Sequence, residues 1–157
     1  MLTGSNVPFL EVVVSTSVET PRDVVEQLFL ELPSRDAGRF AARMAPAAVF
    51  EIPFPIPGQP TRIEGREEIR DYLASRWSGT PGIELHGIRP TIHETTEPGL
   101  FVTECDIDIT RPGAGREWVR SSVNVIRVED GLVTLFRDYM DTGRIQSMRM
   151  AAERAEV

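Results

Sequence analysis

Apolar residues spaced three and four positions apart predict three helices in the first half of the chain. The first helix begins after Thr20, a residue type that caps helices, and ends before Pro33. A second, short helix is expected over 36–44. A third is expected over 66–77, with an apolar stripe formed by Ile69, Tyr72, Leu73 and Trp77.

Beyond Gly82 the spacing changes to the alternation that is typical of strands. Four β-rich runs are separated by turn residues, of which Asp130-Gly131 is a strong hairpin signal. The runs cover 83–94, 100–111, 116–129 and 132–140. Strands are also expected over 47–52 and 62–64, on either side of the proline-rich loop 53–60, and a last helix begins at Asp141-Thr142.

Helices followed by a long antiparallel meander predict an α+β fold. In such a fold a curved sheet wraps around the helices and leaves a pocket on its concave face. The 157 residues suit one domain, 1–157, with a core over about 20–150.

Composition narrows the classes of partner and cofactor. The formal net charge of −7 argues against nucleic acid and anionic membranes, so we expect a small apolar molecule as the partner. The single cysteine, Cys105, excludes an internal disulfide. The two histidines, His86 and His93, do not have zinc-site spacing, and we expect neither a metal nor an organic cofactor.

The first 20 residues, MLTGSNVPFLEVVVSTSVET, do not resemble a signal peptide. They lack a cationic start and a small-residue cleavage site. No window of the chain approaches 18 apolar residues. We therefore expect a soluble, cytoplasmic protein.

A carboxylate interrupts the last predicted strand, in the segment LFRDYM. Alternation puts Asp138 on the same face as Phe136 and Met140. A carboxylate among apolar side chains is partly desolvated, which raises its pKa and suits it to acid/base work near neutral pH. The alternative is a structural ion pair with an arginine such as Arg120.

The segment ECDIDI also alternates, with Glu104, Asp106 and Asp108 on one face. If that face is concave, these carboxylates converge on Asp138, and one of them could be held protonated as a general acid. If it is exposed, it is only a polar surface.

The strand that follows has polar residues on one alternating face. There, Arg120 could neutralise Asp106 or Asp108, while Ser122 and Asn124 could orient a ligand oxygen or a water. The alternative is an exposed or subunit-contact face. The face consists of Trp118, Arg120, Ser122 and Asn124.

Three segments together resemble the SnoaL-like branch of the nuclear transport factor 2 superfamily: IEGREEIRDYLASRW, IHETTEPGLFVTECD and VEDGLVTLFRDYMD. The resemblance extends to limonene-1,2-epoxide hydrolases, PhzA/PhzB proteins and SnoaL-like polyketide cyclases. It implies a conical barrel with a deep apolar cavity, a homodimer formed through the outer face of the sheet, and no metal or organic cofactor. It also implies that Asp138 is the acid/base of the pocket.

The epoxide hydrolase pattern is not reproduced in full. This chain has Phe50-Glu51-Ile52 where those enzymes have Tyr-x-Asn, and it has no arginine between Glu104 and Asp108. Among the members it resembles, the cyclases need the fewest extra residues, since they use an acidic residue at the position of Asp138 to remove a carbon-bound proton.

We therefore predict a cofactor-independent isomerase or cyclase of specialised metabolite biosynthesis that acts on a small hydrophobic polyketide- or isoprenoid-like molecule, with epoxide opening as a less favoured reaction. Asp138 would take a proton, and Asp106 or Asp108 would return one. The alternative is a non-catalytic binding or accessory protein of the same fold. The expected pocket walls are Phe54, Tyr72, Trp77, Phe136 and Met140.

Overall fold

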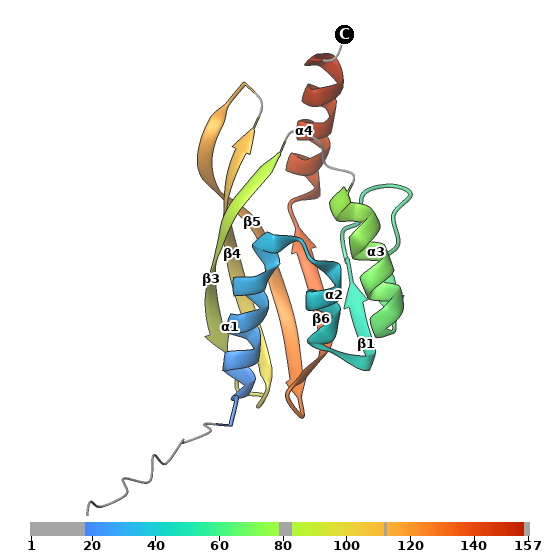
Figure 1. Ribbon diagram of the computed structural model, residues 1–157, viewed down its shortest axis with the longest axis vertical. Helices are drawn as coiled ribbons and strands as arrows, with labels where there is room; N and C mark the ends of the chain where they lie inside the picture. Colours follow the sequence, from blue (N-terminus) through green and yellow to red (C-terminus); the bar gives the residue numbers. More distant parts are fainter. Residues whose placement is uncertain (1–17, 79–82, 112, 156–157) are drawn as a thin grey trace, which may run out of the picture.

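The structure, a computed structural model of the chain, describes residues 18–78, 83–111 and 113–155. Three helices lie on one side of a curved sheet, and a fourth helix continues from the end of its last strand (Figure 1). The predicted α+β fold is confirmed. No helix among the described residues is long and apolar enough to cross a membrane.

Local sequence explains where the helices begin. Helix α1 (Pro21–Glu31) starts with a capping box, in which the Asp23 N–H donates to the Thr20 hydroxyl and the Thr20 N–H donates to the Asp23 carboxylate. Asp36 caps α2 by accepting from the Arg39 N–H at 3.0 Å. The remaining helical elements are the 3₁₀ turn η1 (Leu32–Ser34), α2 (Ala37–Ala42), α3 (Arg66–Ser78) and α4 (Thr142–Ala155).

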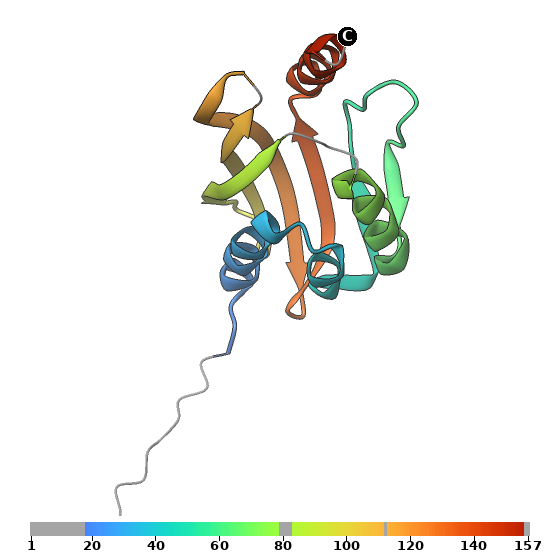
Figure 2. The ribbon, with the colours of Figure 1, turned by 45° about the horizontal axis from the view of Figure 1, so that its top comes forward.

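The six strands form one sheet in the order β2-β1-β6-β5-β4-β3. All pairs are antiparallel except β1 with β6. Because β2 and β3 are the two edges, the sheet curves without closing (Figure 2). The strands are β1 (Met44–Glu51), β2 (Arg62–Glu64), β3 (Glu84–Glu94), β4 (Leu100–Arg111), β5 (Gly115–Glu129) and β6 (Leu132–Met140), so the predicted meander is confirmed.

A β-bulge at Ser121 changes which side chains of β5 face inward. Cys105 of β4 is opposite Ser122, whereas the next residue, Asp106, is opposite Arg120, so Ser121 is one residue too many in β5. The bulge divides the face that was predicted from strict alternation. Ser122 and Asn124 lie on the inner face with Cys105, while Trp118 and Arg120 lie on the outer face.

A second bulge affects the start of β6. Val128 is opposite Val133 and Arg127 is opposite Leu135, which leaves Thr134 as the extra residue. Uninterrupted alternation along the predicted strand 132–140 would put Thr134 on the face of Phe136, and the bulge interrupts that alternation. The completely buried Val133 precedes the bulge, and Phe136 continues the inner face beyond it.

Aromatic rings join the helices to the inner face of the sheet. The Phe50 and Phe136 rings stack with centroids 5.3 Å apart, and Phe40 meets Phe136 edge-on at 5.5 Å. Trp77 of α3 meets Phe40 edge-on at 5.9 Å. Burying each large apolar side chain stabilises the fold by roughly 1.5–3 kcal/mol. The same four side chains also line the cavity between helices and sheet.

Candidate active site

A cavity of about 290 Å³ lies between the helices and the inner face of the sheet. This volume is close to the lower limit for sites that bind small organic molecules. The charged residues of its lining are Arg35, Arg76 and Asp138. Most of the other lining side chains are apolar, among them Phe40, Phe50, Leu73, Trp77, Leu85, Ile88, Ile107, Ile109, Phe136, Met140 and Ile145.

Asp138 is the carboxylate of this cavity. It lies on the inner face of β6 with Phe136 and Met140, as the sequence predicts. Burial raises its pKa to about 7, and this effect outweighs the hydrogen bond from Asn124 and the positive charge of Arg76, both of which lower the pKa. The carboxyl group is therefore close to half ionised near neutral pH, where it can both take and return a proton.

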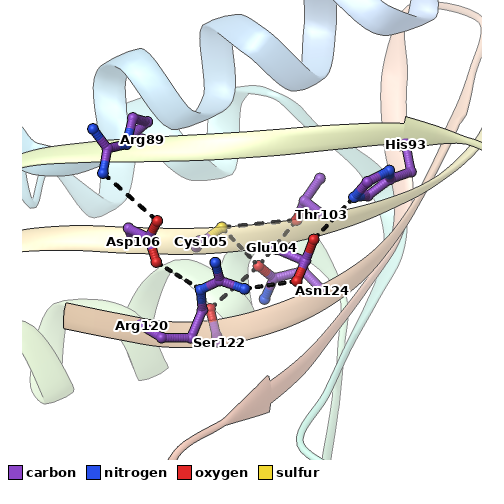
Figure 3. Close-up of polar contacts among 9 residues, drawn as sticks. All are labelled: Arg89, His93, Thr103, Glu104, Cys105, Asp106, Arg120, Ser122 and Asn124. Carbon is purple, nitrogen blue, oxygen red and sulfur yellow. Dashed lines mark hydrogen bonds and ion pairs between the residues drawn. The ribbon is translucent and has the colours of Figure 1, made fainter.

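Asn124 presents a hydrogen-bond donor to Asp138. Its Nδ2 donates to Oδ1 of Asp138 at 2.8 Å, and its own side chain is almost completely buried. Around its Oδ1 lie the donors of Thr103, Cys105 and Ser122, at 3.2, 3.2 and 3.3 Å (Figure 3). Because three donors converge on the amide oxygen, the amide nitrogen is directed at Asp138.

Tyr72 and Arg76 are the polar groups of α3 near Asp138. Burial raises the pKa of the Tyr72 phenol, and among its smaller causes the Arg76 charge lowers this pKa while the Asp138 charge raises it. The buried Tyr72 hydroxyl has no hydrogen-bond partner among the described residues. The Arg76 guanidinium lies 5.9 Å from the centre of the Tyr72 ring. Both groups are therefore close enough to influence charge at Asp138.

The structure separates Asp106 and Asp108 from Asp138, which corrects the predicted convergence of carboxylates. Neither lines the cavity, because both lie on the outer face of β4. Arg120 donates to Asp106 at 2.6 Å and Arg116 donates to Asp108 at 2.6 Å. These hydrogen bonds hold the pKa of each carboxyl below its usual value.

Arg120 belongs to the outer face as well, so its predicted place in the pocket is corrected. It binds Glu104 at 2.6 Å as well as Asp106, and His93 lies 3.1 Å from Glu104 (Figure 3). The other histidine, His86, is hydrogen-bonded to Thr110. Within the described ranges, no group of three or more His, Cys, Asp or Glu side chains is arranged to hold a metal ion.

Phe54 is a further correction, because its side chain lies outside the cavity. It is 63% exposed and packs against Tyr139, with ring centroids 5.7 Å apart. Loop 53–60 supplies none of the lining residues, and it reaches the site through Gln59, which accepts from Arg76 at 3.5 Å. The other expected pocket residues do line the cavity: Tyr72, Trp77, Ser122, Asn124, Phe136 and Met140.

Sequence reasoning missed both arginines of the cavity. Arg76 had a usable signal, since it follows Tyr72 by four residues and must share that face of α3. Arg35 had none, because it lies in a turn outside any periodic segment. Thr103 and Cys105 were also missed as supports of Asn124, because the bulge that brings them opposite its face of β5 has no clear signature in the sequence.

With this geometry in view, the chain can be assigned to a family. Residues 25–136 match the model of the SnoaL-like domain, so the chain belongs to the SnoaL-like domain family, as its sequence predicts. YesE, an uncharacterised protein from Bacillus subtilis (strain 168), is 31% identical over 93 residues, 59% of this chain and 61% of YesE. The chain thus matches about three fifths of the length of that relative. The uncharacterised PhzA/B-like protein PA3332 from Pseudomonas aeruginosa is 28% identical over 115 residues, 69% of this chain and 74% of PA3332.

Solved structures share the fold at lower identity. A Bacillus subtilis protein named provisionally as an isomerase has a TM-score of 0.64 at 24% identity, over 77% of this chain and 86% of its own. TerC, co-crystallised with polyporic acid, has a TM-score of 0.64 at 18% identity, over 82% and 96%. SalBIII, an epoxide hydrolase/cyclase-like enzyme with a role in pyran ring formation in salinomycin, has a TM-score of 0.58 at 18% identity, over 78% and 92%. At these identities the likeness shows the fold alone.

Proposed function

We propose that this protein is a cofactor-independent acid/base enzyme of the isomerase or cyclase type, acting on a small apolar metabolite. The observation that carries the proposal is Asp138, a carboxyl group with a pKa of about 7 in an apolar cavity. Groups whose pKa values are shifted toward neutrality inside a cavity are characteristic of general acid/base catalysts. Ring formation by SalBIII and ligand binding by TerC are compatible with this class of reaction and ligand.

In the proposed reaction, the ionised Asp138 removes a proton from a carbon next to a carbonyl group of the substrate. The electrons of the C–H bond move into the carbonyl, which becomes an enolate oxygen. The protonated Asp138 then returns the proton to another carbon, which gives isomerisation. Alternatively, the enolate carbon attacks a second carbonyl and the proton goes to the new alkoxide, which closes a ring.

The side chains around Asp138 have distinct tasks in this proposal. Asn124 holds the carboxylate through the 2.8 Å hydrogen bond and keeps one oxygen directed into the cavity. Arg76 places positive charge where the enolate oxygen develops. The Tyr72 hydroxyl is a further donor near Asp138 for the carboxylate or a substrate oxygen, since it is buried, is affected by the Asp138 charge and has no hydrogen-bond partner among the described residues.

The proposal replaces the proton donors that the sequence suggested. Asp106 and Asp108 are held ionised by arginines on the far face of the sheet, so they are not suited to donate protons in the cavity. Asp138 would instead serve both as base and as acid. The cavity walls select an apolar substrate of polyketide or isoprenoid type because they offer few polar groups to a sugar or nucleotide.

The test combines titration with proton exchange. We expect carbon-detected NMR of Asp138 to give a pKa of about 7. We also expect the wild type to speed deuterium incorporation from D₂O into 2-tetralone, an apolar ketone with acidic C–H bonds next to its carbonyl. Asp138→Asn should slow this exchange by roughly a hundredfold or more.

Asp106→Asn is the matched control, because it removes a carboxylate of the same sheet that lies outside the cavity. It should leave the exchange rate unchanged. A pKa of Asp138 near that of a free carboxyl group, or equal exchange by wild type and Asp138→Asn, would contradict the proposal. Binding without exchange would then favour a non-catalytic binding or accessory protein.

We propose in addition that the protein is a cytoplasmic homodimer joined through the outer face of the sheet. That face carries Trp118 and Val123, which are 47% and 36% exposed, among charged side chains. Apolar side chains surrounded by ion pairs suit a contact between two copies. Light scattering should give twice the mass of one chain, and Trp118→Glu should give single chains. A wild type that is already monomeric would overturn this assembly.

A further inference from the structure

One cation of the cavity has no carboxylate partner among the described residues. Arg35 follows η1, is half-buried and lines the cavity. Its guanidinium makes no hydrogen bond or ion pair with any residue that the structure describes. By contrast, Arg43 binds Glu19 and Glu31, and Arg120 binds Glu104 and Asp106. These two arginines, which lie outside the cavity, are thus neutralised by neighbouring carboxylates in a way that Arg35 is not.

The backbone at Arg35 is in a conformation that arginine rarely adopts. Its φ of 51° and ψ of 31° are left-handed, which is unfavourable for a residue with a Cβ atom. The turn itself needs only backbone atoms, since the Arg35 N–H donates to the Leu32 carbonyl at 3.0 Å. A glycine would form this turn with less strain. Strained positions of this kind cluster at functional sites, where the side chain is needed.

The charged side chains that line the cavity do not neutralise one another: there are two arginines, Arg35 and Arg76, and one carboxyl group, Asp138. Arg76 acts on Asp138, because its positive charge lowers the pKa of that carboxyl group. If Arg76 is assigned to the ionised Asp138, the charge of Arg35 remains without a counter-ion among the described residues. This surplus lies inside a chain with a net charge of −7. A partly buried cation without a counter-ion favours an anionic ligand.

We propose that Arg35 binds a carboxylate group of the substrate, so that the ligand of this cavity is an apolar carboxylic acid. This inference rests on the proposed function, since it names the substrate class of the same cavity. The planar fork of a guanidinium matches the two oxygens of a carboxylate. Binding one end of the molecule at Arg35 fixes how its apolar body lies against Asp138, which orients the C–H bond for proton removal.

The test compares an acid with its neutral analogue. Calorimetry would measure the binding of 2-naphthylacetate and of 2-naphthylacetamide, which share the same apolar body. We expect the wild type to bind the acid about tenfold more tightly, as one charge-assisted hydrogen-bonded contact would give. Arg35→Met should bind both compounds equally, with its affinity for the amide unchanged.

Two further variants make the result decisive. Arg35→Gly removes the charge and relieves the left-handed strain, so it should be at least as stable as the wild type and should still lose the preference for the acid. Arg39→Met, on the exposed side of α2, should keep the preference. Equal binding of acid and amide by the wild type, no measurable binding of the acid, or a preference that survives in both Arg35 variants would overturn the inference.

The test of the acid-binding site can succeed or fail independently of the test of the proposed enzyme activity. A preference for the acid that depends on Arg35, together with proton exchange that is indifferent to Asp138, would support the acid-binding site and reject the enzyme. Exchange that depends on Asp138, without any preference for the acid, would support the enzyme and reject the role of Arg35.

Discussion

The two faces of the sheet differ in the environment that they provide for carboxyl groups. On the outer face, Arg120 binds both Glu104 and Asp106. Hydrogen bonds from His93 and Arg120 lower the pKa of Glu104, and the hydrogen bond from Arg120 lowers the pKa of Asp106. On the inner face, Asn124 donates to Asp138 of the neighbouring strand, and burial raises the pKa of that carboxyl to about 7. Adjacent positions of one sheet therefore hold carboxylates that are permanently ionised and one that can exchange protons.

The difference shows that partner and solvent, more than residue type, decide what a carboxylate can do. The ionised form of an exposed carboxylate beside an arginine is stabilised both by hydration and by the opposite charge. Asp138 has lost most of its hydration, and its negative charge is stabilised only in part by the Asn124 hydrogen bond and by the charge of Arg76. The contrast can be tested by removing the carboxylates one at a time.

The largest expected effect is on how the stability of Asp138→Asn depends on pH. The folded-state pKa of Asp138 is raised, so its contribution to stability is fully present below the unfolded pKa and is lost as pH rises toward about 7. Between about pH 4 and about pH 8, the free energy of unfolding of Asp138→Asn should therefore rise relative to the wild type. The gain is at most about 4 kcal/mol, since one pKa unit corresponds to about 1.4 kcal/mol. Urea unfolding of both proteins across this range measures it.

A difference between wild type and Asp138→Asn that stays constant over that pH range would show that Asp138 titrates normally. The faces of the sheet would then be chemically alike, and the proposed acid/base role would lose its basis.

An intermediate effect is expected from Asn124→Ala. The substitution leaves the donors of Thr103, Cys105 and Ser122 without their shared acceptor, and leaving buried polar groups unpaired costs about 1–3 kcal/mol. It also removes the hydrogen bond that lowers the pKa of Asp138, so that pKa should move above about 7. Urea unfolding and NMR titration measure the two effects.

Ser122→Ala is the companion variant for Asn124, because it removes one of the three donors and leaves the amide in place. It should change the pKa of Asp138 much less than Asn124→Ala does. If the two variants shift the pKa equally, the amide is not what holds the carboxylate.

The smallest effect is expected on the outer face, from Asp106→Asn. The pKa of Asp106 is lowered by Arg120, so its contribution to stability is present above the unfolded pKa and is lost only as pH falls through the lower, folded value. Between about pH 5 and about pH 8 this variant should show a small loss that does not depend on pH, because exposed ion pairs contribute little. A loss that grows with pH over this range would contradict the assignment of Asp106 to a solvated ion pair.

The architecture could be predicted from the sequence because the positions of its helices and strands follow from local patterns, namely helix caps, turn residues and strand alternation. Thr20, the hairpin at Asp130-Gly131 and the four strand runs are local features, and they lie where they were predicted. Asp138 could be recognised because its apolar neighbours Phe136 and Met140 share its alternating face. Local pattern was thus sufficient wherever the strand was regular.

The site was predicted less completely because its shape depends on departures from regularity. Strict alternation placed Arg120 with Asn124, and a single extra residue at Ser121 separated them. Alternation does not distinguish the concave face of β4 from its outer face, so it allowed Asp106 to be expected near Asp138. Arg35 enters the cavity through a left-handed turn that no periodicity marks. Bulges and turns depend on long-range packing, which a single sequence does not display.

The hydrogen bond from Cys105 to Asn124 gives the protein a built-in vibrational probe. The S–H stretch of a thiol absorbs in an infrared window where other protein groups are silent, and this chain has one cysteine. The thiol donates to the same amide that donates to Asp138, so a change in the charge of Asp138 should alter the strength of the S–H hydrogen bond. The frequency of that single band would follow the protonation of the cavity carboxyl group, without any label and while a ligand is added.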